Sequence, residues 1–233
     1  MAVNKKNVLV VAAHPDDEVL GCGATISKFS KLKYNVNVLI LGKGLDSRLN
    51  FSKKNSLEKK RTKLLSSAIK ANKLLGVKKI NFENFPDNQF DTVSLLKIAK
   101  IIESHIMKSK PNTILTHSIS DLNIDHQKTF EAVMTATRTS TSNFVKNIYS
   151  FEVPSSTDWA FNFKKKNFIP NLFINVEKEI QTKLKALKFY SSEMRNFPNS
   201  RSIENCKYLA YTRGASIGCK AAECFEVIRS IKD

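Results

Sequence analysis

Residues 7–13 read Asn-Val-Leu-Val-Val-Ala-Ala, and the polar sequence His14-Pro-Asp-Asp-Glu18 follows them directly. A continuous apolar run of this length is typical of a strand that is buried on both faces, as in a parallel sheet covered by helices. Apolar residues then recur at helical spacing as far as about residue 34. The stretch predicts a buried strand that ends in a cluster of polar groups and leads into a helix.

The same alternation of strand and helix continues through the first 140 residues. We expect three further strands, over residues 36–41, 79–83 and 113–117, and helices between and after them, over about residues 55–75, 91–107 and 126–138. Four such units in succession favour an α/β fold: a Rossmann-like, mostly parallel sheet with helices on both faces and right-handed crossovers.

The pattern loosens after residue 145. There we expect strands over residues 149–153 and 171–176, a helix over 177–190 and a last helix over 219–231. We therefore predict a single domain over residues 1–233, with a core of about residues 5–140 and a C-terminal elaboration of about residues 145–233. This elaboration is expected to cap the sheet or to form a wall of the substrate site.

The composition is that of a globular chain. Of the 233 residues, 42% are hydrophobic and 25% are charged, which argues against disorder. No apolar run approaches the ~20 residues of a membrane-spanning helix, and the N-terminus lacks the pattern of a secretory signal. The four cysteines show no CxxC spacing, as expected of reduced thiols. These features predict a cytoplasmic protein without a transmembrane segment.

The formal net charge is +17, and only seven of the 38 basic residues are arginine. Nucleic-acid-binding proteins rely on arginine, whose planar fork pairs with phosphates and base edges. Evenly spread lysines favour a solvated surface instead, so we expect no nucleic-acid partner. A basic polyanion-binding protein is the alternative from a different class, and its affinity would fall steeply with salt. No GxGxxG segment follows the first strand, which argues against a dinucleotide-binding enzyme.

Polar clusters follow two of the expected strands. The first is His14 to Glu18, and the second runs from His117 to His126. Ligands of open parallel sheets bind at the carboxyl ends of the strands, and buried unpaired charge is costly. Each cluster alone is explained by a turn and a helix cap, but together they favour a divalent cation. Two imidazoles and a carboxylate with an open position are typical of catalytic zinc.

His14-Pro-Asp-Asp-Glu-Val-Leu-Gly-Cys-Gly and Asp121-Leu-Asn-Ile-Asp-His126 resemble the signature segments of the PIG-L/LmbE-like N-acetylglucosaminyl deacetylases. The likeness covers roughly residues 5–140 and extends more loosely through residues 151–159, which are similar to members from bacterial surface-polysaccharide pathways. The resemblance implies that His14, Asp17 and His126 bind Zn²⁺ and that Asp16 is the general base. Fe²⁺ tolerates the same ligand set.

One position departs from the family pattern. Many members have a histidine two residues before the Asp-His pair, where this sequence has Asn123. An asparagine amide can donate to an oxyanion but cannot deliver a proton. The general-acid role then passes to Asp16 or to His117, and we favour Asp16. Asp121 and Asp125 are expected to orient a histidine or a backbone group rather than to bind metal.

The resemblance implies an N-acetylated amino-sugar substrate from which acetyl is removed as acetate. Arg48 and Asp87 match positions that contact sugar hydroxyls or phosphate, although a loop cation and a turn residue are the plain alternatives. Trp159 would stack on the sugar, or else lie in the core. Three C-terminal arginines, Arg195, Arg201 and Arg213, either meet a phosphate or are structural. A nucleotide- or lipid-linked sugar for polysaccharide synthesis, a small thiol glycoside and another acylated amine stay open as substrates, as does a homo-oligomer.

Overall fold

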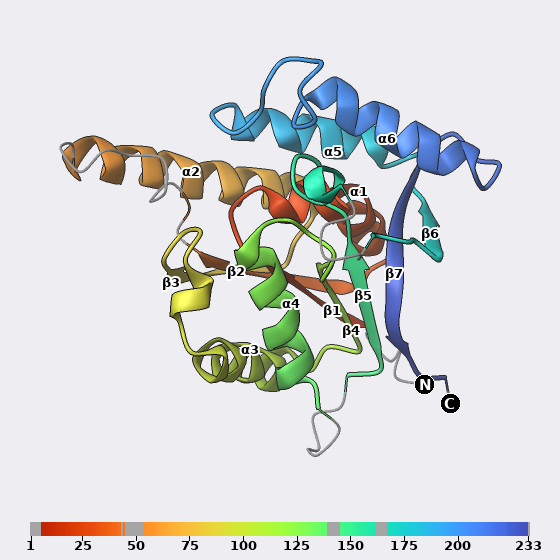
Figure 1. Ribbon diagram of the computed structural model, residues 1–233. Coiled ribbons are helices and arrows are strands. Elements are labelled where there is room, and N and C mark those ends of the chain that lie inside the picture. Colours follow the sequence, from red (N-terminus) through yellow and green to blue (C-terminus); the bar gives the residue numbers. More distant parts are fainter. Residues whose placement is uncertain (1–5, 43, 45–53, 139–144, 162–166, 233) are drawn as a thin grey trace.

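The computed structural model describes residues 6–42, 44, 54–138, 145–161 and 167–232. Its centre is a seven-stranded sheet in the order β3-β2-β1-β4-β5-β7-β6 (Figure 1). The strands are β1 (Asn7–Ala12), β2 (Asn35–Gly42), β3 (Lys79–Phe85), β4 (Thr113–His117), β5 (Asn147–Phe151), β6 (Leu172–Asn175) and β7 (Ala222–Ser230). Strands β1 to β5 are parallel, and β7 runs antiparallel to both β5 and β6. The predicted α/β class and mostly parallel sheet are confirmed.

Helices cover both faces of the sheet. They are α1 (Asp17–Lys31), α2 (Lys54–Leu75), α3 (Leu95–Ser109), α4 (Ile124–Ala136), α5 (Ile180–Leu187) and α6 (Ile203–Ala215). Because successive side chains of a strand point to opposite faces, Val8 and Val10 of β1 pack with α1, α2, α5 and α6, whereas Leu9 and Val11 pack with α3 and α4. The sheet is therefore buried on both sides, as the apolar run in β1 predicts. No helix of the described residues is long and apolar enough to cross a membrane.

The prediction for the end of the chain is wrong in one respect. The expected last helix over 219–231 is the strand β7, which fills the position between β5 and β6. A short run of apolar and charged residues fits either structure, so periodicity alone does not separate them. Helix α6 was not predicted, because its buried face consists of the small residues Cys206, Ala210 and Gly214. A Cβ on Gly214 would lie 2.6 Å from the backbone nitrogen of Ala221.

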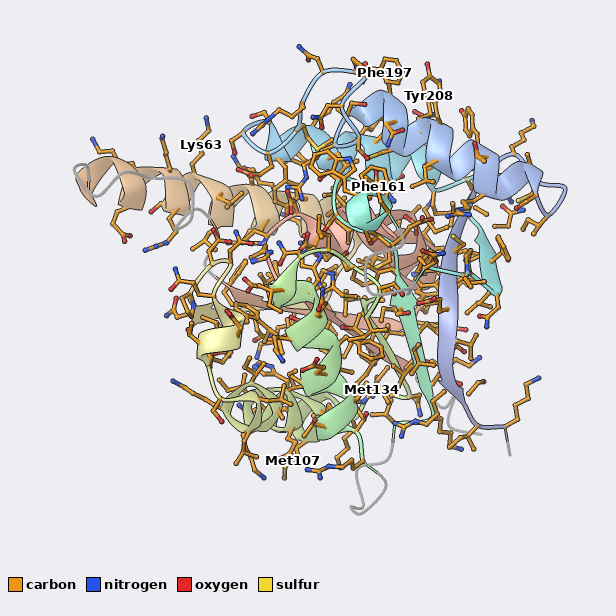
Figure 2. All side chains as sticks on the ribbon, viewed as in Figure 1. Lys63, Met107, Met134, Phe161, Phe197 and Tyr208 are labelled. Atoms are coloured by element: carbon orange, nitrogen blue, oxygen red, sulfur yellow. The ribbon has the colours of Figure 1, made fainter. Side chains whose placement is uncertain are left out.

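The C-terminal region also has apolar side chains on its outer surface. Phe161, Phe197 and Tyr208 are all more than half exposed (Figure 2). The rings of Phe197 and Tyr208 meet edge to face, with centroids 5.9 Å apart. Phe197 lies on the segment between α5 and α6, the same segment that forms part of the pocket described below.

Helix α1 is interrupted at Cys22, whose φ of −143° and ψ of 25° are not helical. An interruption leaves backbone groups without their helical partners, and such groups are costly to bury. Glu223 of β7 accepts hydrogen bonds from the N–H groups of Ala24 (3.1 Å) and Thr25 (2.6 Å). Its carboxylate therefore caps the second part of the helix.

Lys183 of α5 provides a hydrogen-bond donor for a backbone carbonyl group that precedes the interruption in α1. Its ammonium donates to the carbonyl oxygen of Leu20 (2.7 Å) and to Oε1 of Glu223 (2.6 Å). Glycine is required at position 21 because a Cβ on Gly21 would come within 2.2 Å of the Phe151 ring. A buried ion pair from the C-terminal region thus supports the helix that carries the first polar cluster.

This pair generates a prediction about stability. We expect Lys183→Ala to lower the free energy of unfolding by about 3–5 kcal/mol, because it leaves the buried carboxylate of Glu223 without its cationic partner. Lys100→Ala is the matched control: Lys100 is 66% exposed and its partner Glu103 is 32% exposed, so the loss of this surface pair should cost less than about 1 kcal/mol. Urea unfolding of both variants measures the difference, and equal effects would contradict the role given to Lys183.

Candidate active site

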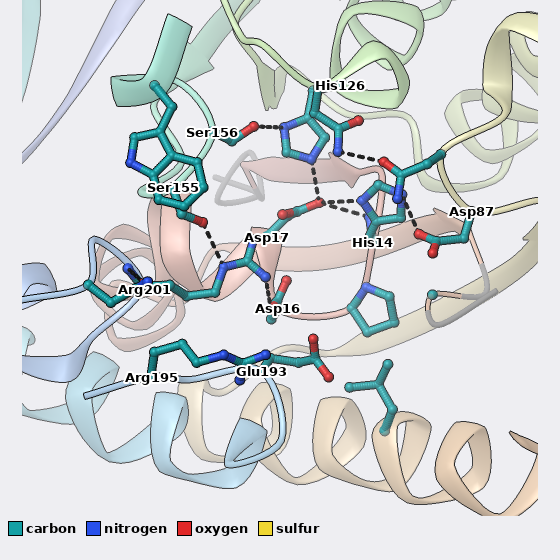
Figure 3. A pocket seen from close by; sticks show the side chains of 17 residues that line it. His14, Asp16, Asp17, Asp87, His126, Ser155, Ser156, Glu193, Arg195 and Arg201 are labelled. Atoms are coloured by element: carbon teal, nitrogen blue, oxygen red, sulfur yellow. Dashed lines mark hydrogen bonds and ion pairs between the residues drawn. The ribbon is translucent and has the colours of Figure 1, made fainter. Parts of the chain in front are cut away.

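The two polar clusters meet at the carboxyl ends of β1 and β4. These strands are neighbours at the centre of the sheet, on either side of the point where the strand order reverses. Open α/β sheets bind ligands in the crevice at such a point. The rings of His14 and His126 lie here with their centroids 5.5 Å apart, and both face one pocket (Figure 3).

Asp17 lies between the two imidazoles. Its Oδ2 is 3.3 Å from Nδ1 of His14 and 3.1 Å from Nε2 of His126. The three side chains form a group whose potential ligand atoms lie within 4.8 Å of one another, and all three line the pocket. Two imidazole nitrogens and a carboxylate oxygen that converge beside an open space match the donor set of a catalytic metal site.

Each of these histidines is held by a second carboxylate. Nε2 of His14 lies 2.8 Å from Oδ2 of Asp125, and Nδ1 of His126 lies 3.0 Å from Oδ2 of Asp121. A histidine that binds metal through one nitrogen commonly donates its other N–H to a carboxylate, which sets the ring orientation. Asp121 and Asp125 therefore lie behind the imidazoles, and their orienting role stays a prediction.

The two orienting carboxylates are themselves fixed. Oδ2 of Asp125 accepts from the backbone N–H of Asn88 (2.6 Å), and Oδ1 accepts from that of Phe90 (2.8 Å). Asp121 accepts hydrogen bonds from the hydroxyl groups of Ser156 and Thr157. Ser156 and Thr157 come from the loop after β5, so the C-terminal region takes part in positioning His126.

Two further groups of side chains have ligand-like spacing: His117, Asp121 and His126, and His14, Asp87 and Asp125. In each of these groups at least one side chain lies outside the pocket, because His117, Asp121 and Asp125 do not line it. Nε2 of His117 already accepts the backbone N–H of Ala13 at 2.8 Å.

His117 lies behind His126, and the two rings stack with centroids 3.9 Å apart. Burial lowers the pKa of His117 to about 3. The imidazole is therefore neutral near pH 7 and has no proton to spare, which speaks against His117 as the general acid.

Asp16 has a strained backbone. Its φ is 113°, in a region that non-glycine residues rarely occupy, and the residue is only 2% exposed. Burial raises the pKa of its carboxyl group to about 8, although Arg201 opposes this shift. A carboxyl group with a pKa near neutrality can both accept and return a proton, and strained residues cluster at functional sites.

Glu18 holds the turn that contains Asp16. Its carboxylate accepts hydrogen bonds from the backbone N–H of Asp16 (3.0 Å), from the Tyr190 hydroxyl (2.6 Å) and from the Asn72 amide (2.7 Å). Glu18 is fully buried, so these three donors compensate its loss of solvent. Tyr190 and Asn72 come from distant elements, and no local sequence pattern identifies them.

The pocket has a volume of about 290 Å³. Of the predicted substrate-binding residues, Asp87 and Trp159 line it, and Arg48 lies outside the described residues. Trp159 is 43% exposed, so it is not a core residue. Asn123 also lines the pocket, where its Oδ1 caps α4 through the N–H of Asp125 and its Nδ2 donates to Asn88.

The C-terminal arginines differ in position. Arg201 and Arg195 line the pocket, whereas Arg213 forms a two-point ion pair with Glu152 away from it. Arg201 contacts Asp16 itself, and the buried Glu193 lines the same wall. The sequence raised Arg201 only as a phosphate contact or structural residue and did not single out Glu193.

The protein-family model described as GlcNAc-PI de-N-acetylase, PIG-L, matches residues 9–137. The uncharacterized deacetylase YaiS of Escherichia coli K12 is 27% identical over 197 residues, which cover 82% of this chain and 94% of the relative. A probable N-acetyl-alpha-D-glucosaminyl L-malate deacetylase of Bacillus anthracis is 24% identical over 195 residues, 82% of each chain. The N,N'-diacetylchitobiose deacetylase of Pyrococcus horikoshii shares the fold, with a TM-score of 0.76, 21% identity and coverage of 97% of this chain and 85% of that one.

The converging donors generate a prediction about metal content. We expect the wild-type protein to retain stoichiometric zinc after dialysis, and His14→Ala and His126→Ala to lose it, because each lacks one of three donors. Atomic absorption on the folded variants measures the ratio. His105→Ala is the control, since His105 is a half-buried imidazole that pairs with Glu83 of β3 and does not line the pocket. Stoichiometric zinc in a His14→Ala/His126→Ala double variant would exclude this ligand group.

The carboxylates that orient the imidazoles generate a prediction about zinc affinity. Asp121→Asn should weaken zinc binding about 10–100-fold without abolishing it, because the amide holds the His126 ring less firmly. Competition with a chromophoric chelator gives the dissociation constant. Asp91→Asn alters an exposed carboxylate and should leave the affinity unchanged, whereas an equal loss in both variants would show a non-specific charge effect.

Proposed function

The chain belongs to the PIG-L family, and from this membership and the geometry of the pocket we propose that it is a metal-dependent N-deacetylase. The reaction removes the acetyl group of an N-acetylated amino sugar and releases acetate and the free amine. One observation carries the proposal: His14, Asp17 and His126 converge in a pocket that also contains the buried carboxyl group of Asp16.

His14, Asp17 and His126 would hold the cation, and bound Zn²⁺ would supply an activated water and polarise the amide carbonyl. The donor set also suits Fe²⁺. His14 and His126 present Nδ1 and Nε2 respectively, since their other nitrogens face Asp125 and Asp121. These carboxylates keep the two rings in the orientation that binding requires.

Asp16 is the proposed general base and general acid. Its carboxylate takes a proton from the attacking water as the oxygen–carbon bond forms at the acetamide carbonyl. The same carboxyl group then gives that proton to the leaving nitrogen as the carbon–nitrogen bond breaks. Burial raises the pKa of this carboxyl group to about 8 in the metal-free protein, so the group can hold a proton between the two steps. Asn123 is a donor to the developing oxyanion, because its Nδ2 has a second hydrogen besides the one given to Asn88.

The pocket suits one sugar ring. Its volume of about 290 Å³ lies at the lower end for small-molecule sites. Trp159 offers an exposed aromatic face on which the apolar side of a sugar can stack, and Asp87 offers a carboxylate for a hydroxyl group. Curated relatives include a deacetylase named for an N-acetylglucosaminyl substrate. Arg48 is retained as a proposed contact to sugar or phosphate.

A place in bacterial surface-polysaccharide synthesis is the proposed context, with a nucleotide- or lipid-linked amino sugar as substrate. It is supported by the sequence over residues 151–159, which in this structure covers the last residue of β5 and the segment after it beside the pocket. The four cysteines are free thiols, which fits the reducing cytoplasm.

Acetate release tests the proposal. Chelated protein and zinc-refilled protein are incubated with N-acetylglucosamine, its phosphate and nucleotide derivatives, a lipid-linked form and a thiol glycoside. We expect release only after zinc is restored, and a fall of about 10²–10⁴-fold in Asp16→Asn, the usual contribution of general acid–base catalysis. The best substrate identifies the acceptor.

Asp91→Asn serves as the control carboxylate, because Asp91 is exposed and outside the pocket. Acetate release that is unchanged in Asp16→Asn would remove Asp16 from the mechanism. Protein that binds zinc but releases no acetate from any compound would contradict the substrate class while leaving the metal site in place.

A further inference from the structure

Arg201 bridges two segments that are far apart in the chain. Its Nη1 donates to Oδ2 of Asp16 at 3.1 Å, and its Nε donates to Oγ of Ser155 at 2.9 Å (Figure 3). The side chain is 17% exposed and lies in the wall of the pocket. Its guanidinium is therefore in direct contact with the proposed acid–base residue.

The backbone around Arg201 is fixed from several directions. Its N–H donates to Oδ1 of Asn199, and its carbonyl oxygen accepts the N–H of Arg195, both at 2.9 Å. The next residue, Ser202, caps α6 by accepting the N–H of Asn205 at 3.0 Å. Arg201 is thus attached to the start of a helix and does not sit on a free loop.

The partner segment is fixed too. Ser155 has a φ of 69°, which non-glycine residues adopt rarely, and its N–H donates to Oγ of Ser200 at 3.0 Å. Ser200 in turn contacts the carboxylate of Asp158. Two loops of the C-terminal region are therefore joined beside Arg201, and the position of the Ser155 hydroxyl group that accepts from Nε is defined.

Arg201 is the one side chain of the described residues that bonds the Asp16 carboxylate. It engages Oδ2, and Oδ1 receives no hydrogen bond from the described chain. We infer that Arg201 is a positioning residue, which holds Asp16 through Oδ2 so that Oδ1 is the oxygen that accepts and returns the proton. This inference rests on the proposed acid–base role of Asp16.

Arginine suits this role better than lysine. Its planar group has donors at fixed angles, so Nε and Nη1 reach two acceptors on different loops at once. A lysine ammonium is a single point of charge on a flexible stem and does not impose an orientation on both partners. Arg201→Lys should therefore keep the positive charge in the pocket and lose much of the alignment.

Kinetics of folded, zinc-loaded variants provide the first test. We expect Arg201→Gln to lower kcat by roughly 100-fold, the size of effect that misplacing a reacting group can have, with little change in KM. Arg201→Lys should recover only part of the loss. Arg213→Gln, which breaks a comparable arginine–carboxylate pair outside the pocket, is the matched control and should keep the wild-type kcat.

A double-variant cycle separates positioning from a general structural effect. If Arg201 acts through Asp16, adding Arg201→Gln to Asp16→Asn lowers kcat no further, because the group to be positioned is already inactive. Losses that multiply in the double variant would overturn the inference. So would a rise in KM confined to phosphorylated substrates, since this would identify Arg201 as a contact to substrate phosphate.

Crystal structures of metal-free wild-type and Arg201→Gln protein give a readout that needs no activity. We expect the Asp16 carboxylate to turn or to occupy more than one orientation in the variant, while the Asp16 N–H bond to Glu18 persists. An unchanged carboxylate would overturn the inference even if kcat falls. Failure of the deacetylase proposal would appear separately, as wild-type protein that releases no acetate, and the crystallographic comparison would still decide the positioning role.

Discussion

The contacts of the buried Asp17 carboxylate with the imidazoles of His14 and His126 are the interaction on which the rest of the site depends. Three polar side chains converge here in a buried position. Their burial costs free energy unless their remaining polar atoms have hydrogen-bond partners. Asp121 and Asp125 provide those partners for the imidazoles. The surrounding loops can then be understood as supports for these two carboxylates.

A second layer of support acts on the backbone. The left-handed conformation at Asp16 directs its side chain into the pocket while Asp17, the next residue, turns toward the histidines. Such a conformation persists only where the neighbouring structure holds it. Glu18, buried with Tyr190 and Asn72, supplies that hold from within the same short sequence motif.

Much of the fold was predictable because the signals are local. The apolar runs that become β1, β2 and β4 are read directly, and so is the location of both polar clusters at strand ends. The C-terminal part was harder, since β7 has no periodicity that excludes a helix and α6 packs through small residues rather than an apolar stripe. Arg201, Tyr190 and Glu193 are remote in sequence from the two polar clusters, and only folding brings them to the site.

The interrupted helix α1 has a consequence for the order in which the protein matures during synthesis. The groups exposed by the break lie near the N-terminus, but the carboxylate that caps them belongs to Glu223, in the last strand of the described chain. A nascent chain still lacking β7 leaves the N–H groups of Ala24 and Thr25 without this acceptor. Helix α1 therefore gains its cap only after Glu223 has left the ribosome, so a product truncated before β7 would carry the signature motif on an uncapped helix.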